Sequence, residues 1–147
     1  MAKQSPPVWE ANKSASRNAA RKLPELAGLY FKAGRRMADG HVSLEALHQF
    51  RLETKRFRYT LELFRSCYGK GLDERLGSLR KIQDLLGEIN DCLTTQNLLG
   101  RKQKSLAPFL QRRIARKRRE LARYWHGSFD AAGQERRWSS YLERFAR

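Results

Sequence analysis

Residues 43–67 read SLEALHQFRLETKRFRYTLELFRSC, and the spacing of the apolar side chains in this stretch decides the fold class. The core-forming side chains recur three or four positions apart, and they are Phe50, Thr54, Phe57, Leu61 and Phe64. At about 100° per residue they fall within an arc of about 80° on one side of a helix. Ser43 is a typical N-cap residue, and two glycines follow Cys67. The stretch therefore predicts an amphipathic helix from Ser43 to about Cys67.

The rest of the chain shows the same helical periodicity, and strand signals are nearly absent. After a flexible lead-in at residues 1–8, we expect a short helix over residues 9–22 that is interrupted or restarts at Pro24 and ends near residue 40. Further helices are expected over residues 72–99, 105–126 and 134–145. Short loops that contain glycine favour antiparallel neighbours. The prediction is an all-α domain spanning residues 9–147, an antiparallel bundle of four main helices with a short terminal helix.

The composition indicates a polyanionic partner. The 147 residues include 31 Lys and Arg against 15 Asp and Glu, which gives a formal net charge of +16. Hydrophobic residues make up 40% of the chain, enough to build a core, so a wholly disordered basic tail is excluded. An excess of positive charge opposes compaction and favours nucleic acid, anionic lipid or condensed phosphate as a ligand.

A row of cations runs along the helix predicted over residues 43–67, on a different side from its apolar stripe. This side carries His48, Arg51, Lys55, Arg58, Tyr59 and Glu62, with Arg56 at its edge. At a rise of 1.5 Å per residue, the row from residue 48 to residue 58 spans roughly 15 Å. Like charges aligned over this distance repel each other unless anions or water screen them. The row therefore suits a ligand that has several phosphates in series.

The helix predicted over residues 105–126 carries a second basic row. Its members recur at spacings of four, three and four residues, and they are Arg112, Arg116, Arg119 and Arg123. Residues 101–123 contain ten basic residues and one acid, so this face lacks the mixed signs of an ordinary solvated helix. The planar guanidinium group can bind two phosphate oxygens at once. We expect the two rows to converge on one trough, although a merely solvated charged face stays open as the alternative.

Signatures of catalysis are missing. The sequence has no P-loop, no HExxH, no Gly-x-Ser-x-Gly and no His/Cys cluster with metal-ligand spacing, so we expect no enzyme activity, no metal and no cofactor. Asp84, Glu88 and Asp91 share one helix and could bind Mg²⁺, but ion pairs with Arg80 and Lys81 are the simpler expectation. No run of about 18 apolar residues occurs, and we expect a cytoplasmic protein with no membrane partner. The two distant cysteines, 67 and 92, are expected to be small buried residues.

Two stretches carry a family resemblance. Residues 48–62 contain the pattern H-x-x-R-x-x-x-K-R-x-R-Y-x-x-E, which resembles the signature helix of the conserved-histidine α-helical domain, CHAD. Residues 79–91, with Gln83 to Gly87 followed by Asn90 and Asp91, are similar to the next helix of that family. The resemblance implies a helical bundle that binds inorganic polyphosphate along a basic channel, in the cytoplasm or at polyphosphate granules.

By position, the resemblance implies that one set of side chains lines the anion channel: His48, Arg51, Lys55, Arg56 and Arg58. Tyr59 and Glu62 would orient these cations. The family's usual module has two related halves, each with a signature helix, whereas this chain has one such helix. We therefore expect a homodimer that rebuilds the channel around a two-fold axis. A half-module with an open basic surface, or pairing with a different half, stays open as the alternative.

The alternative function is a helical RNA- or DNA-binding protein, with nucleic acid as a competitor for the basic surface. Stacking aromatic side chains should then lie among the exposed cations. Phe50, Phe57 and Phe64 belong to the apolar side of their helix instead.

Overall fold

The computed structural model describes residues 5–99 and 102–147, and this part of the chain is helical and contains no strand. The main helices are α1 (Ala15–Ala38), α2 (Leu44–Leu63), α3 (Lys70–Leu99), α4 (Ala107–Tyr124) and α5 (Gln134–Arg144). Short 3₁₀ turns precede α3 and α4, and a π-helical segment, Trp125–Phe129, follows α4. The predicted all-α class, with four long helices and a short terminal one, is confirmed.

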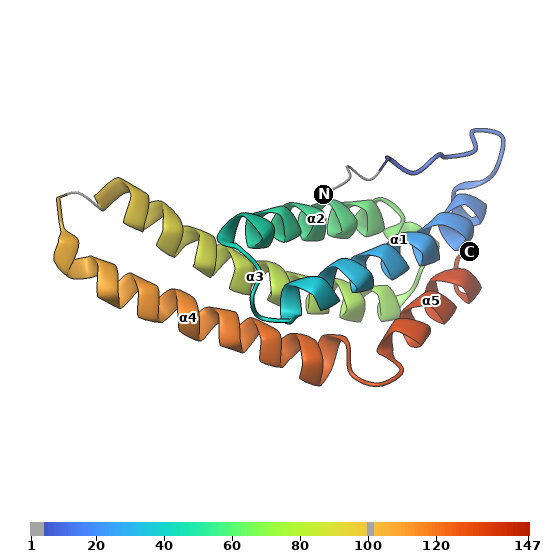
Figure 1. The fold of residues 1–147 in the computed structure, drawn as a ribbon. Helices are drawn as coiled ribbons and strands as arrows, with labels where there is room; N and C mark the ends of the chain where they lie inside the picture. Colours follow the sequence, from blue (N-terminus) through green and yellow to red (C-terminus); the bar gives the residue numbers. More distant parts are fainter. Residues whose placement is uncertain (1–4, 100–101) are drawn as a thin grey trace.

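Consecutive helices from α1 to α4 run antiparallel (Figure 1). Helix α2 packs on α1 and α3, α4 packs on α3, and α5 packs on α1. The second half of α3 and the start of α4 form a hairpin that extends beyond α1 and α2 at one end of the molecule (Figure 1). Each described helix is too polar or too short to span a bilayer.

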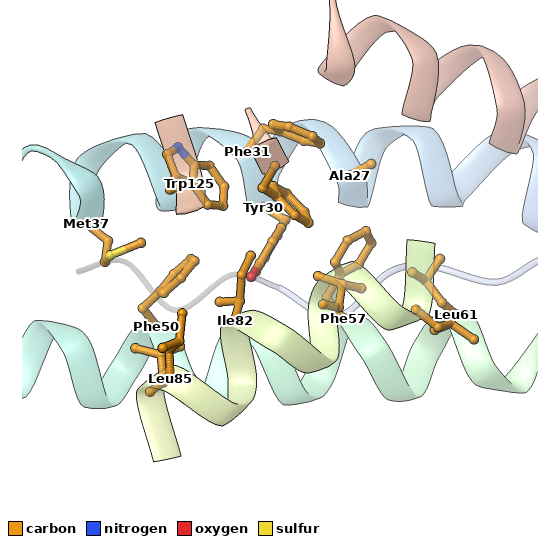
Figure 2. Close-up of a cluster of buried hydrophobic side chains, with 14 of the residues drawn as sticks. Ala27, Tyr30, Phe31, Met37, Phe50, Phe57, Leu61, Ile82, Leu85 and Trp125 are labelled. Atoms are coloured by element: carbon orange, nitrogen blue, oxygen red, sulfur yellow. The ribbon is translucent and has the colours of Figure 1, made fainter. Parts of the chain in front are cut away.

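The core is built around aromatic side chains from α1, α2 and the π-helical segment (Figure 2). The ring of Tyr30 lies 5.2 Å from that of Phe50 and 4.9 Å from that of Phe57. Thr54 donates a hydrogen bond to the Phe50 carbonyl at 2.8 Å, so the buried Tyr30 hydroxyl donates to Thr54 at 2.9 Å. The aromatic packing and this buried hydrogen bond fix α2 against α1 and thereby determine which sides of α2 remain accessible.

The boundaries of α1 differ from the prediction. The expected interruption at Pro24 is wrong, because α1 is one helix from Ala15 to Ala38 with Pro24 inside it. A proline within a helix removes one hydrogen bond, but Leu23 and Ala27 beside it are fully buried, and their packing holds the helix together. Residues 5–14 precede the helix, and the first four residues of the predicted lead-in lie outside the described residues.

Helix α2 begins as predicted and ends earlier. The Ser43 side chain accepts a hydrogen bond from the Ala46 amide at 3.1 Å, which confirms the N-cap. The helix ends at Leu63, and residues 65–67 form a 3₁₀ turn that leads into α3. Cys67 and Cys92 are free and buried, as expected for small apolar side chains.

Candidate functional site

The cations of α2 lie beside its buried face rather than opposite it. Phe50, Thr54, Phe57 and Leu61 are buried, and they anchor the helix to the core. The adjoining flank of α2 carries residues that are all partly buried, namely His48, Arg51, Lys55 and Arg58. We call these four residues the α2 row. Because its side chains are held against the protein, the row is more rigid than a fully solvated set of cations.

Two members of the α2 row have hydrogen-bond donors that are not used. The Nε atoms of Arg51 and Arg58 are buried and have no hydrogen-bond partner among the described residues. The Arg58 side chain is 17% exposed, and its guanidinium group lies 4.9 Å from the centre of the Tyr59 ring. A buried donor without a partner costs free energy, so these groups favour an anionic ligand that can reach them. Tyr59 itself is half-exposed and limits where the Arg58 side chain can go.

Glu62 connects the α2 row to α3. One of its carboxylate oxygens, Oε1, lies 3.4 Å from Arg58 Nε and 3.5 Å from a terminal nitrogen of Arg80. Both distances exceed the usual hydrogen-bond range, so the contacts are loose ion pairs. Glu62 therefore lies between a cation of the α2 row and a cation of the neighbouring helix.

Arg56 lies apart from the α2 row. It is exposed and near the half-buried Glu53, on the flank of α2 that approaches Arg36 of α1. Burial raises the pKa of the Glu53 carboxyl, and the positive charges of Arg56 and Arg36 partly oppose that rise. The structure thus places Arg56 beside an acid of its own, away from the other four cations of the motif.

The arginines of α4 lie on the side of that helix that faces away from its buried residues. Leu110, Ile114 and Leu121 are the buried residues of α4. The residues on the opposite side of the helix are all exposed, and they are Arg112, Arg116, Arg119 and Arg123, called here the α4 row. Helix α4 therefore directs this row away from α3, while the α2 row lies along α3. Arg119 nevertheless lines a small pocket together with Leu47 of α2, and the expectation that the two rows share one trough stays a prediction.

Lys117 lies on the same side of α4 as the buried Leu110, Ile114 and Leu121, and its charge is paired with acidic side chains. Its ammonium group lies 2.7 Å from Glu88 of α3 and 3.3 Å from Glu120. Hydrogen bonds to these two carboxylates raise the pKa of Lys117. The side chain is only 15% exposed, so it joins α4 to α3 and is not part of an open basic surface.

The acidic residues of α3 do not pair as expected. Glu88 pairs with Lys117, whereas Arg80 approaches Glu62 and Lys81 lies 5.0 Å from the centre of the Tyr124 ring. Among the residues that the structure describes, no group of three or more His, Cys, Asp or Glu side chains is placed to hold a metal ion. The open groove between α3 and α4 is lined by charges of both signs. A long polyanion therefore fits the α2 row better than this groove.

Arg80 and Gln83 are neighbours of the site that the charge pattern on α2 could not identify. Arg80 reaches Glu62 from α3, and the side-chain oxygen of Gln83, one turn further along, is buried with no partner among the described residues. Gln83 could have been identified from its position in the second stretch that resembles the family, residues 79–91. For Arg80, only the packing of α3 against α2 brings it near Glu62.

Comparison with known proteins adds a family assignment. A sequence profile described as the CHAD domain matches residues 1–100, about two thirds of the chain. Neither the curated proteins nor the solved structures include a match. The profile covers α1, α2 and α3, and with them both stretches that carry the motifs. The chain belongs to the CHAD domain family.

Proposed function

We propose that this protein binds inorganic polyphosphate without catalysis, through the α2 row. The observation that carries the proposal is that the buried Nε donors of Arg51 and Arg58 make no hydrogen bond to any described residue. They lie in a row of partly buried cations that extends over roughly 15 Å. Membership of the CHAD family, which is associated with polyphosphate, supports the same ligand. A cytoplasmic location belongs to the same proposal.

Binding of this kind is multivalent and electrostatic. Each guanidinium group can contact two phosphate oxygens, and a chain of phosphates offers such oxygens at every step along the row. Because bound polyphosphate releases its counterions, the affinity should fall steeply as salt is added, as it does for nucleic acids. The net charge of +16 attracts the ligand from a distance, and the α2 row determines where it binds.

The direct test is the triple variant Arg51→Ala, Lys55→Ala, Arg58→Ala. We expect the affinity for long-chain polyphosphate to fall by at least about a hundredfold, since three charge-assisted contacts are lost. Isothermal titration calorimetry at physiological salt measures this change. Circular dichroism and thermal unfolding establish that the variant keeps its fold.

A matched control removes the same charge elsewhere. Arg136, Arg137 and Arg144 of α5 are exposed, and replacing all three by Ala also lowers the net charge by three. This variant should lose affinity only a few-fold, through the weaker long-range field. Equal losses in the two triple variants would mean that the protein attracts polyanions by charge alone and that the α2 row is not the site.

Nucleic acid is the second candidate ligand, and exposed aromatic side chains next to cations favour it. Tyr59 is 50% exposed beside Arg58, and Phe109 on α4 is 56% exposed, three residues before Arg112. Bases could stack on such rings. Phe50 and Phe57 are buried, however, so the α2 row offers one aromatic platform and no continuous series of them among the described residues. Polyphosphate, which has no bases to stack, is the better match.

A competition experiment separates the two ligands. Labelled long-chain polyphosphate is displaced by unlabelled polyphosphate or by single-stranded RNA at equal phosphate concentration and physiological salt. Polyphosphate should compete at lower concentration than RNA, and the reverse order would make nucleic acid the ligand. Release of orthophosphate in the presence of Mg²⁺ would contradict the non-catalytic part of the proposal.

A further inference from the structure

Glu62 is an acid that lies between two arginines, one on its own helix and one on α3. Its Oε1 atom is the anionic atom nearest to both Arg58 and Arg80, at 3.4 and 3.5 Å, and the side chain is 32% exposed. Arg58 comes from the same helix, one turn earlier, whereas Arg80 comes from α3 and is 52% exposed. The two guanidinium groups therefore approach one carboxylate oxygen from two different helices.

The contact between Glu62 and Arg80 is longer than the other ion pairs that join separate elements of the described chain. Arg35 binds Asp130 through two nitrogens, both at 2.8 Å, and Lys117 binds Glu88 at 2.7 Å. Those pairs have the short distances of charge-assisted hydrogen bonds and join different elements of the fold. Glu62 makes no hydrogen bond to either arginine, and Arg58 Nε remains without a hydrogen-bond partner although Glu62 is next to it. The single negative charge of the carboxylate offsets only one of the two positive charges and does not satisfy the donors of the two arginines.

We propose that Glu62 is a displaceable internal anion and that Arg80 is a polyphosphate-binding residue contributed by α3. This inference rests on the proposed function. In the free protein the Glu62 carboxylate keeps Arg58 and Arg80 turned toward the same point. A phosphate group takes that position when polyphosphate binds, and Glu62 turns out into solvent. A phosphate provides more acceptor oxygens than the single one that Glu62 presents, so it can satisfy both guanidinium groups.

The proposal gives Glu62 the opposite effect from a residue that only orients cations. If Glu62 competes with phosphate for Arg58 and Arg80, its charge weakens binding. If it only holds the arginines in place, its loss weakens binding instead. The sign of one substitution therefore distinguishes the two roles.

The first variant is Glu62→Gln, which keeps the side chain's size and removes its charge. We expect it to bind long-chain polyphosphate more tightly than the unaltered protein, by roughly threefold or more at physiological salt. The matched control is Glu135→Gln. Glu135 belongs to α5 and also pairs with an arginine, Arg35 of α1, at 2.9 Å. The control gains the same net charge and should change the affinity less than twofold. An unchanged or weaker affinity for Glu62→Gln would overturn the role of Glu62.

The second variant tests Arg80 on its own. Arg80→Ala should weaken binding by about tenfold and reduce the slope of log K against log salt by about one, as expected for a lost phosphate contact. Arg136→Ala removes an equally charged, exposed arginine from α5 and is the control. If the two variants behave alike, Arg80 is not part of the site.

These outcomes remain distinct from failure of the proposed function. If the unaltered protein does not bind polyphosphate, the proposed function fails, and this inference fails with it. If the unaltered protein binds and depends on the α2 row, while Glu62→Gln gains nothing and Arg80→Ala matches its control, only this inference is lost.

Discussion

Gly34 has no side-chain carbon, and this lets α1 lie close to the π-helical segment. Gly34 lies directly against the indole of Trp125, which is fully buried and is among the largest side chains of the core. The Trp125 ring also contacts Phe31 and Phe50, with ring centres 5.9 and 6.0 Å apart. Through these contacts Gly34 sets the position of α2 and, with it, that of the α2 row.

Gly34→Ala should destabilise the protein strongly. A methyl group at this position would overlap the Trp125 ring, and overpacking of this kind typically costs about 1–3 kcal/mol. For a chain of this size we expect the melting temperature to fall by roughly 2–4 °C for each kcal/mol lost. Differential scanning calorimetry measures the shift.

Gly28 on the same helix provides the control for this substitution. A methyl group there would meet no atom within 4 Å, so Gly28→Ala should be neutral or stabilise the helix by up to about 1 kcal/mol. If Gly34→Ala were as stable as Gly28→Ala, the close packing of α1 against Trp125 would be contradicted.

At the scale of elements, periodicity predicted the existence and type of every main helix, because an amphipathic helix must place its apolar side chains three and four positions apart. Ser43 and the apolar stripe of α2 were predictable for this reason. The continuity of α1 through Pro24 was not, because burial of Leu23 and Ala27 outweighs the local effect of proline, and burial depends on the other helices.

The candidate site was predictable only in part, for a similar reason. The cations of the α2 row share one side of one helix, so their positions follow from sequence spacing. The approach of Arg80 to Glu62 and the direction of the α4 row depend on how separate helices pack. No local pattern in the sequence shows either of them.

Because the two rows lie on different helices, we expect them to respond differently to ligand length. Replacing all four arginines of the α4 row by Ala should lower the affinity for tripolyphosphate no more than the α5 triple variant does, since so short a ligand can occupy only one row and loses only long-range attraction. The same variant should bind long-chain polyphosphate several-fold more weakly, because a long chain can reach both rows and gains from the second contact. Calorimetric titration with ligands of two lengths checks this.

The two triple variants and the α4 variant together assign the contacts. If the α4 variant loses affinity for tripolyphosphate as much as the α2 variant does, the order of the two sites is wrong. If it loses no affinity for long-chain polyphosphate either, the α4 row is a solvated surface and does not bind the ligand.

At the scale of the whole molecule, the chain has one signature helix, so no second signature helix of the same chain lies opposite the α2 row. Next to the row, α2 exposes apolar side chains seven and four residues apart: Leu52, Tyr59 and Leu63, of which Leu63 is 80% exposed. Such a stripe beside a charged row is suited to contact with a second copy of the chain, and polyphosphate bound between the two copies would offset their mutual repulsion.

We expect polyphosphate to convert the protein from monomers to dimers. Size-exclusion chromatography with light scattering, run with and without the ligand, reports the mass directly. The double variant Leu52→Ser, Leu63→Ser should remain monomeric, whereas Leu98→Ser, which changes an equally exposed leucine on α3, should still dimerise. Monomers of the unaltered protein under both conditions would reject the dimer.

The hairpin at the far end of the molecule has a consequence for motion. Beyond Cys92, α3 has no buried side chain among the described residues, and the first buried residue of α4 is Leu110. Residues 93–99 and 102–109 are therefore held by the backbone and by half-buried contacts between two helices, and Figure 1 shows this part of the described chain extending beyond α1 and α2. Local opening there needs far less free energy than global unfolding, so its amide hydrogens should exchange with solvent long before those around Trp125.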